Sequence, residues 1–75
     1  MNEAMMLHQK RILHRIWKFE CEQLEEDLFV FKKTIDDVKI FWNIKHQVGV
    51  YTINGESPSL ILNWETLEDL MDKIR

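Results

Sequence analysis

The sequence predicts an α+β fold in which two helices flank an antiparallel meander of three to four short strands. Residues 3–27 contain no Gly or Pro and place apolar side chains at helical spacing. Residues 38–62 instead alternate apolar and polar side chains between turn-forming residues, which is typical of short strands. Short connections between such strands favour antiparallel neighbours. The expected order is α-β-β-β-α, with a fourth strand if residues 28–33 are extended.

The first predicted helix spans residues 3–27, and its apolar positions form one broad face. At about 100° per residue, the following side chains share that face: Met5, Met6, Ile12, Leu13, Ile16, Trp17, Phe19 and Leu24. Residues 1–18 carry four basic and one acidic side chain, whereas residues 19–37 carry two basic and seven acidic ones. A helix dipole favours the opposite order, with acids near the start. A partner or a buried face is therefore expected to stabilise this helix.

The predicted strands cover about residues 28–33, 38–45, 49–54 and 59–63. TIDD, at 34–37, and the dipeptide Asn54-Gly55 are expected to turn the chain, and the latter suits positive φ. In the segment VKIFWNIK, alternation places one set of side chains on a single face: Val38, Ile40, Trp42 and Ile44.

The closing helix is predicted over residues 64–74. It has acids near its start and Lys73 near its end, in agreement with the helix dipole. One face of it is apolar, and both Trp64 on that face and Trp42 on the sheet are expected to lie in the core between sheet and helices.

Length and composition indicate one domain over residues 1–75. A domain of this size buries only about 60% of its unfolded surface, but 45% of the residues are hydrophobic, including three Trp and four Phe. Cys21 is the single cysteine, so no internal disulfide is possible, which fits a reducing compartment. No apolar run approaches the roughly 18 residues that span a bilayer. We therefore expect a cytoplasmic protein that makes no contact with a membrane.

No catalytic or ligand-binding motif is evident, so the sequence predicts neither an enzyme nor a cofactor or metal site. His8, His14 and Cys21 are separated by six and seven residues, which is not the spacing of a zinc site. The two glycines, Gly49 and Gly55, both fall in predicted turns and form no phosphate-binding loop.

The leading hypothesis is therefore a small non-enzymatic interaction module, such as a regulator, inhibitor or adaptor. Its contacts are expected to come from the first helix, from an aromatic sheet face that includes Phe41, Tyr51 and Ile61, or from both. The predicted partner-binding residues are Lys10, Arg11, Arg15, Lys18, Glu22, Glu25, Glu26, Trp17, Phe41 and Tyr51. A short chain that starts with Met also fits an accessory protein of a phage or plasmid.

Two kinds of partner remain open for the first helix. Its opposed charge blocks would match in an antiparallel homodimer, because the basic half of one copy faces the acidic half of the other. A different protein with the complementary order of charges would pair with this helix in the same way. The alternative function is nucleic-acid binding through the basic stripe Lys10, Arg11, His14, Arg15 and Lys18.

Overall fold

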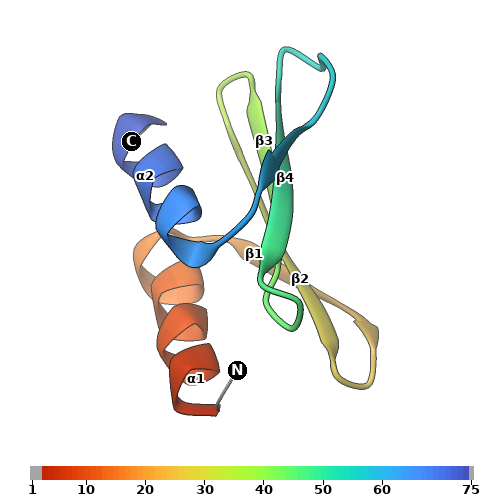
Figure 1. Ribbon diagram of the computed structural model, residues 1–75, viewed down its shortest axis with the longest axis vertical. Helices are drawn as coiled ribbons and strands as arrows, with labels where there is room; N and C mark the ends of the chain where they lie inside the picture. The colour runs from red at the N-terminus through yellow and green to blue at the C-terminus, as the bar shows by residue number, and fades with distance from the viewer. Residues whose placement is uncertain (1–2, 75) are drawn as a thin grey trace.

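The computed structural model describes residues 3–74 and has the predicted α+β architecture (Figure 1). In chain order the elements are helix α1 (Glu3–Arg11), the π-helical segment η1 (Ile12–Ile16), strands β1 (Glu20–Glu25), β2 (Leu28–Ile35), β3 (Val38–Asn43), β4 (Val48–Ile53) and β5 (Ser59–Ile61), and helix α2 (Trp64–Ile74). The strands form one antiparallel meander in the order β1-β2-β3-β4-β5. The helix–meander–helix order is confirmed, and the sheet has one strand more than the largest number predicted.

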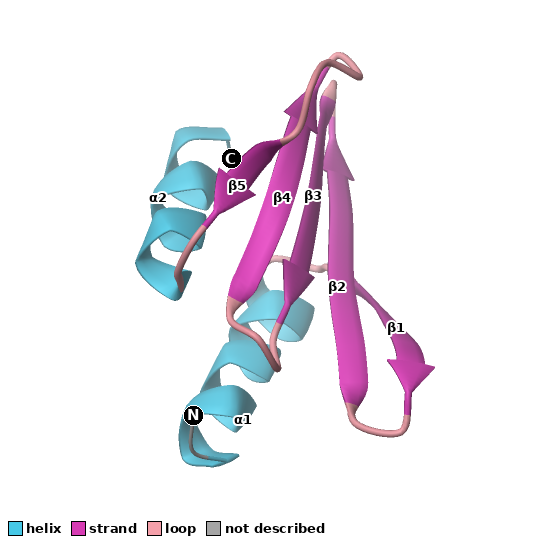
Figure 2. Cartoon of the chain, turned by 45° about the vertical axis from the view of Figure 1, so that its right-hand side comes forward, coloured by secondary structure: helices cyan, strands magenta, loops and turns pink. Residues whose placement is uncertain are grey.

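Both helices pack against the same face of the sheet, and none of the described elements covers the other face (Figures 1 and 2). The buried cluster lies between these two layers. It consists of Leu13, Trp17, Phe19, Phe31, Val38, Ile40, Trp42, Ile44, Ile61, Leu67 and Met71. The predicted alternation in β3 is confirmed, because Val38, Ile40 and Trp42 are buried whereas Lys39 and Phe41 are exposed. Trp64 is half-buried and packs against this cluster, as expected.

The prediction of one helix over residues 3–27 is wrong. The helical chain ends at Ile16, and residues 20–25 form β1, which pairs with β2. Lys18 adopts a positive φ of 61°, a conformation that no helix continues through. The Phe19 N–H donates to the Leu13 carbonyl at 2.8 Å, which closes the end of the helical segment.

Strand pairing explains why the acidic segment leaves the helix. All six residues of β1 are exposed, so burial of an apolar face does not place it. Pairing with β2 instead supplies hydrogen-bond partners for the backbone groups of β1. Across the two strands, the Lys32 ammonium lies 3.3 Å from the Glu22 carboxylate. Because the acidic residues lie on β1, the helical segment ends on basic residues, His14 and Arg15. The unfavourable charge order inferred for a single long helix therefore does not occur.

The turn at Asn54-Gly55 is confirmed. Both residues have positive φ, 56° and 73°, and the Glu56 N–H donates to the Ile53 carbonyl at 3.0 Å. Two central residues at positive φ define the type I′ turn that this dipeptide favours. At the β2–β3 turn the strand extends further than predicted, and Asp36, with φ 53°, makes the tight connection.

Candidate protein-binding surface

The uncovered side of the sheet carries a row of side chains that crosses all five strands. The register places Glu20 opposite Lys32, Lys32 opposite Phe41, Phe41 opposite Val50, and Val50 opposite Leu60. Directly opposed residues on neighbouring strands project from the same face. We use the name open face for the central residues of this surface: Lys32, Lys39, Phe41, Val50 and Leu60.

The apolar part of the open face is well exposed to solvent. Phe41 is 38% exposed and Leu60 is 64% exposed, and Leu62, just after β5, is 67% exposed. Val50, between Phe41 and Leu60 in the register, is half-buried. Scattered single apolar side chains are ordinary on protein surfaces, but a contiguous row is typical of an interaction site.

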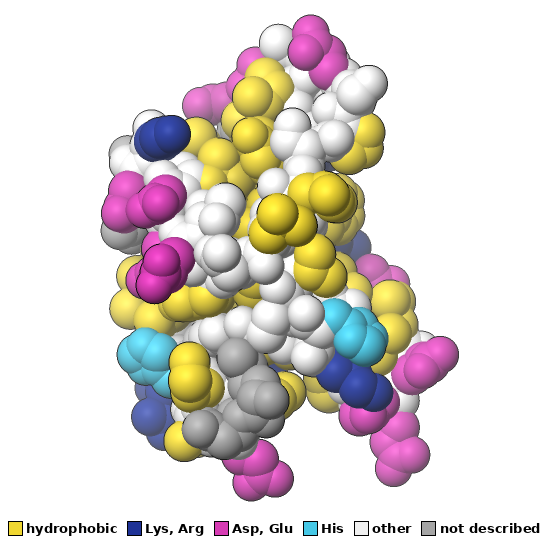
Figure 3. All heavy atoms as spheres, viewed as in Figure 1, with side chains coloured by type: hydrophobic (Ala, Val, Ile, Leu, Met, Phe, Trp, Pro, Cys, Tyr) yellow, Lys and Arg dark blue, Asp and Glu magenta, His cyan; other side chains and the backbone are white. Residues whose placement is uncertain are grey.

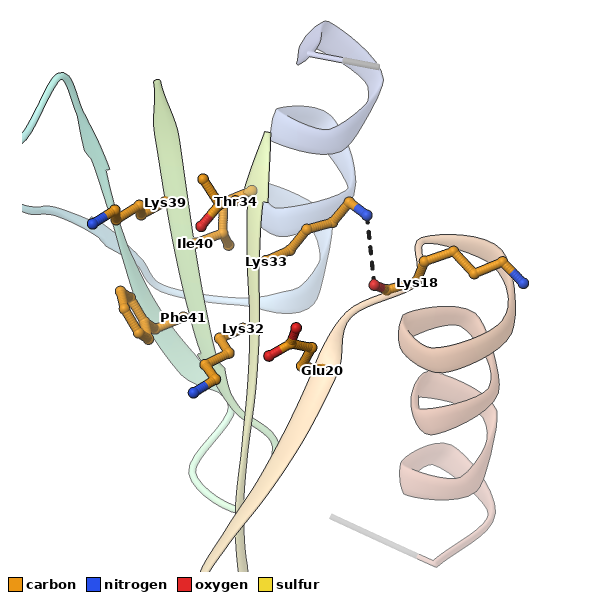
Figure 4. A pocket seen from close by; sticks show the side chains of 8 residues that line it. All are labelled: Lys18, Glu20, Lys32, Lys33, Thr34, Lys39, Ile40 and Phe41. Carbon is orange, nitrogen blue, oxygen red and sulfur yellow. Dashed lines mark hydrogen bonds between the residues drawn. The ribbon is translucent and has the colours of Figure 1, made fainter. Parts of the chain in front are cut away.

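Positive charge lies beside this apolar row. A hollow of about 450 Å³ at the β1–β3 side is lined by four lysines, Lys18, Lys32, Lys33 and Lys39, and by one carboxylate, that of Glu20. Figure 4 shows that the ammonium groups of Lys18, Lys32 and Lys39 point in different directions. The Lys33 ammonium donates to the Lys18 carbonyl oxygen at 3.5 Å. Lys32 and Lys39 therefore give the open face a basic border, and the four lysines do not converge on a single bound anion.

The sheet-face prediction was correct for Phe41 and wrong for Tyr51 and Ile61. Tyr51 lies opposite the buried Ile40, on the side that the helices cover, and packs against the core. Ile61 is fully buried on the same side. The apolar residues in the same row as Phe41 are Val50 and Leu60, which cannot be identified from the sequence because alternation within one strand does not determine the register between strands.

A second surface brings together three of the predicted helix residues. Arg11, Arg15 and Lys10, with His14, form the rim of a groove of about 400 Å³ between the helical segment and the β1–β2 hairpin. The apolar side chains that line it are Leu7, Cys21, Phe29 and Phe31. The Lys10 ammonium lies 4.9 Å from the centroid of the Phe29 ring, within cation–π range. We call this surface the α1 groove.

Cys21 is the exposed thiol of the α1 groove. Partial burial raises the pKa of this thiol, and the nearby Lys10 charge lowers it by a smaller amount. The net shift is upward, so Cys21 is a neutral thiol at neutral pH and not an activated nucleophile.

The remaining predicted partner-binding residues are dispersed. Trp17 is buried and stacks on Trp64 with ring centroids 5.2 Å apart, so it is a core residue. Lys18 lies in the connection to β1, and Glu22 pairs with Lys32. The other two predicted acids, at the β1–β2 hairpin, are Glu25 and Glu26.

The antiparallel helix dimer loses its basis in this arrangement. It required acidic and basic halves on one helix, whereas Glu22 and Glu25 lie on β1. Figure 3 shows acidic side chains over α2, at the upper end of the sheet and at the tip of the β1–β2 hairpin, and basic side chains beside α1. The basic residues therefore lie on the helical segment, whereas the acids of residues 20–25 lie on β1.

No helix within residues 3–74 has the length and apolarity needed to cross a membrane. Within the same part of the chain, no group of three or more His, Cys, Asp or Glu side chains is placed to hold a metal ion. Comparison of the chain with protein-family models, curated proteins and solved structures finds no match.

Proposed function

We propose that this chain is a non-enzymatic protein-binding module whose open face receives an apolar, acid-bordered surface of another protein. The observation that carries the proposal is the row Phe41, Val50 and Leu60 on the side of the sheet that no described element covers. Burying an apolar row of this kind against a partner removes it from water, which is the main favourable term in protein association.

The charge beside the row specifies the partner further. Lys39 lies next to Phe41 on the open face and forms no ion pair within residues 3–74, and Lys32 has only the exposed Glu22 as its partner. An acidic border on the other protein would complement these ammonium groups and would mainly favour rapid and specific association. A rigid sheet supports the site, so little ordering of the backbone accompanies binding.

The test combines capture of partners with cross-linking at a defined position. Leu60→Asp places a charge at the β5 end of the apolar row, and Ile16→Asp makes the same kind of change at an isoleucine that is 62% exposed on η1. A protein retained from host lysate by the unaltered chain and by Ile16→Asp, but lost with Leu60→Asp, is the expected partner. A photoreactive phenylalanine analogue at position 41 should cross-link to that same protein, and the same analogue at position 16 should not.

Three outcomes would contradict the proposal. Equal retention of every protein by the unaltered chain and Leu60→Asp would show that the open face is not the binding surface. Cross-linking from position 41 only to a second copy of the chain would identify a self-association surface instead. Recovery of nucleic acid that is released by moderate salt, with no protein, would favour the nucleic-acid alternative, because phosphate contacts weaken steeply with salt.

A further inference from the structure

The α1 groove lies on the opposite side of the sheet from the open face, so it is a separate surface. One stripe of the helical segment supplies its wall: Leu7, Lys10, Arg11, His14 and Arg15 follow helical spacing. The opposite stripe, with Gln9, Leu13 and Trp17, is buried against the rest of the protein. The groove-lining side chains are therefore held by a helix whose other side is fixed.

The charge in the groove is of one sign. None of its lining residues is a carboxylate, and neither Arg11 nor Arg15 forms an ion pair with any residue of the described chain. These two arginines are four residues apart, a spacing at which like charges repel on a helix. No ion pair within residues 3–74 offsets this repulsion, and a bound anion would relieve it.

The groove also has apolar lining residues that a small inorganic anion would not contact. Phe29 and Leu7 are among them, and Phe29 is already in contact with a cation, the Lys10 ammonium. A volume of about 400 Å³ falls within the range of roughly 300–1,000 Å³ that is usual for small-molecule sites. A mostly apolar concavity with a few charged groups at one rim is the general form of such sites.

We propose that the α1 groove binds a single-chain anionic amphiphile, with its carboxylate between Arg11 and Arg15 and its apolar chain against Leu7 and Phe29. A guanidinium group donates two parallel hydrogen bonds to a carboxylate, which favours this head group over an uncharged one. A longer polyanion such as nucleic acid would continue from the groove towards Glu25 and Glu26 at the hairpin, where like charges repel it.

Cys21 provides a direct readout, because the only thiol of the chain lines the groove and is exposed. The probe is dodecanoate, used below its micelle concentration, and the measured quantity is the rate at which N-ethylmaleimide, an uncharged reagent, modifies Cys21. At a ligand concentration of about ten times the Kd, modification should slow about tenfold, because only the free protein reacts. Dodecanol, with the same chain and no charge, should protect much less.

Substitutions test whether Arg11 and Arg15 select the charged head group. The double substitution Arg11→Gln and Arg15→Gln should weaken dodecanoate binding about tenfold or more and leave the weak effect of dodecanol unchanged. Lys73→Gln, which removes an exposed charge on α2, is the matched control and should not alter protection. Far-ultraviolet circular dichroism verifies that each variant is folded. Dodecyl phosphate in place of dodecanoate shows whether the rim prefers a carboxylate.

Several results would overturn the inference. Equal protection by dodecanol and dodecanoate would show that the arginines do not select the head group. Unchanged dodecanoate protection in the double variant would place the anion elsewhere. Stronger protection by a single-stranded oligonucleotide, lost as salt is raised, would make the groove a nucleic-acid site. Amide shifts on adding dodecanoate should cluster at Leu7 and Phe29, and shifts confined to Phe41 and Leu60 would assign binding to the open face. The open-face proposal does not depend on any of these outcomes.

Discussion

The indole ring of Trp64 meets that of Trp42 edge to face, with ring centroids 5.9 Å apart and planes at 61°. Trp64 also stacks on Trp17, with centroids 5.2 Å apart and planes at 25°. One side chain at the start of α2 therefore links the end of the helical segment to the centre of the sheet. Edge-to-face and offset-stacked geometries are the favourable ones for aromatic pairs.

Trp42→Ala should lower the free energy of unfolding by about 3–5 kcal/mol, because the ring is fully buried and its removal leaves a large cavity. Chemical denaturation monitored by circular dichroism measures the loss. Trp42→Phe is the informative control. The indole Nε1 is buried with no acceptor within the described chain, so Phe removes no hydrogen bond and should cost clearly less than Ala. An unchanged denaturation midpoint for Trp42→Ala would contradict the assigned core.

Gly49→Ala should destabilise the fold by about 1–3 kcal/mol or more, because there is no room for a methyl group at this position. Gly49 lies opposite Trp42, and an added Cβ would collide with the Phe41 carbonyl oxygen and lie 3.1 Å from Trp42 Cε3. Gly55→Ala is the matched control. A Cβ there meets nothing within 4 Å, and only its φ of 73° opposes the substitution, which costs about 1 kcal/mol. If Gly49→Ala lowered the melting temperature less than Gly55→Ala did, the close approach of Gly49 to Phe41 and Trp42 would be contradicted.

Gln9→Leu should lower stability by about 1–3 kcal/mol even though it adds no polar atom to the interior. Gln9 is 1% exposed, and its amide exchanges two hydrogen bonds with the amide of Gln47, at 2.9 and 2.7 Å. Leucine leaves the Gln47 amide without this partner, although its bond to the Ile44 carbonyl at 2.8 Å remains. The double variant Gln9→Leu and Gln47→Leu should recover part of the loss. A double-mutant cycle by urea unfolding with no coupling between the sites would rule out this link between α1 and the β3–β4 turn.

Lys45→Gln should raise the pKa of Asp27 in an NMR titration. In the unaltered chain the Lys45 ammonium donates to the Asp27 carboxylate at 2.7 Å, and this hydrogen bond and charge hold the pKa of Asp27 below its ordinary value. Because the folded-state pKa is lowered, the pair stabilises the fold above the ordinary pKa of aspartate, and this contribution is lost as pH falls through the lowered value. The pair is exposed, so the effect on unfolding should be small and should decrease with salt. An unaltered Asp27 titration in Lys45→Gln would show that the pair does not form in solution.

The closing helix and the central strand were predictable because their signals are local. In α2, the apolar spacing of Leu67 and Met71 determines which side is buried, and the predicted bounds of residues 64–74 match the structure. In β3, alternation alone separates Trp42 from Phe41. The Asn54-Gly55 turn was predictable for the same reason, because the preference for positive φ belongs to the residues themselves.

The β1 segment was not predictable, because its conformation depends on a partner. ECEQLE buries no side chain, and it is a strand only where β2 lies beside it. Tyr51 and Leu60 show the same limit at the candidate site. The sequence alone does not show which of the two lies on the same side of the sheet as Phe41, because a shift of one residue in the register exchanges the two sides.

Local patterns in the sequence are enough to predict the α+β class, the position of α2, the burial of Trp42 and the placement of Phe41 on the opposite side of β3. Each of these follows from a period or a turn preference within a few residues of chain. Packing between distant segments determines that both helices cover one face of the sheet and that the acidic segment is a strand. It also places Phe41 in one row with Val50 and Leu60, and Arg11 and Arg15 in one groove with Leu7 and Phe29. Those relationships join residues far apart in the chain, and their free energy comes from pairing and packing that no single segment contains.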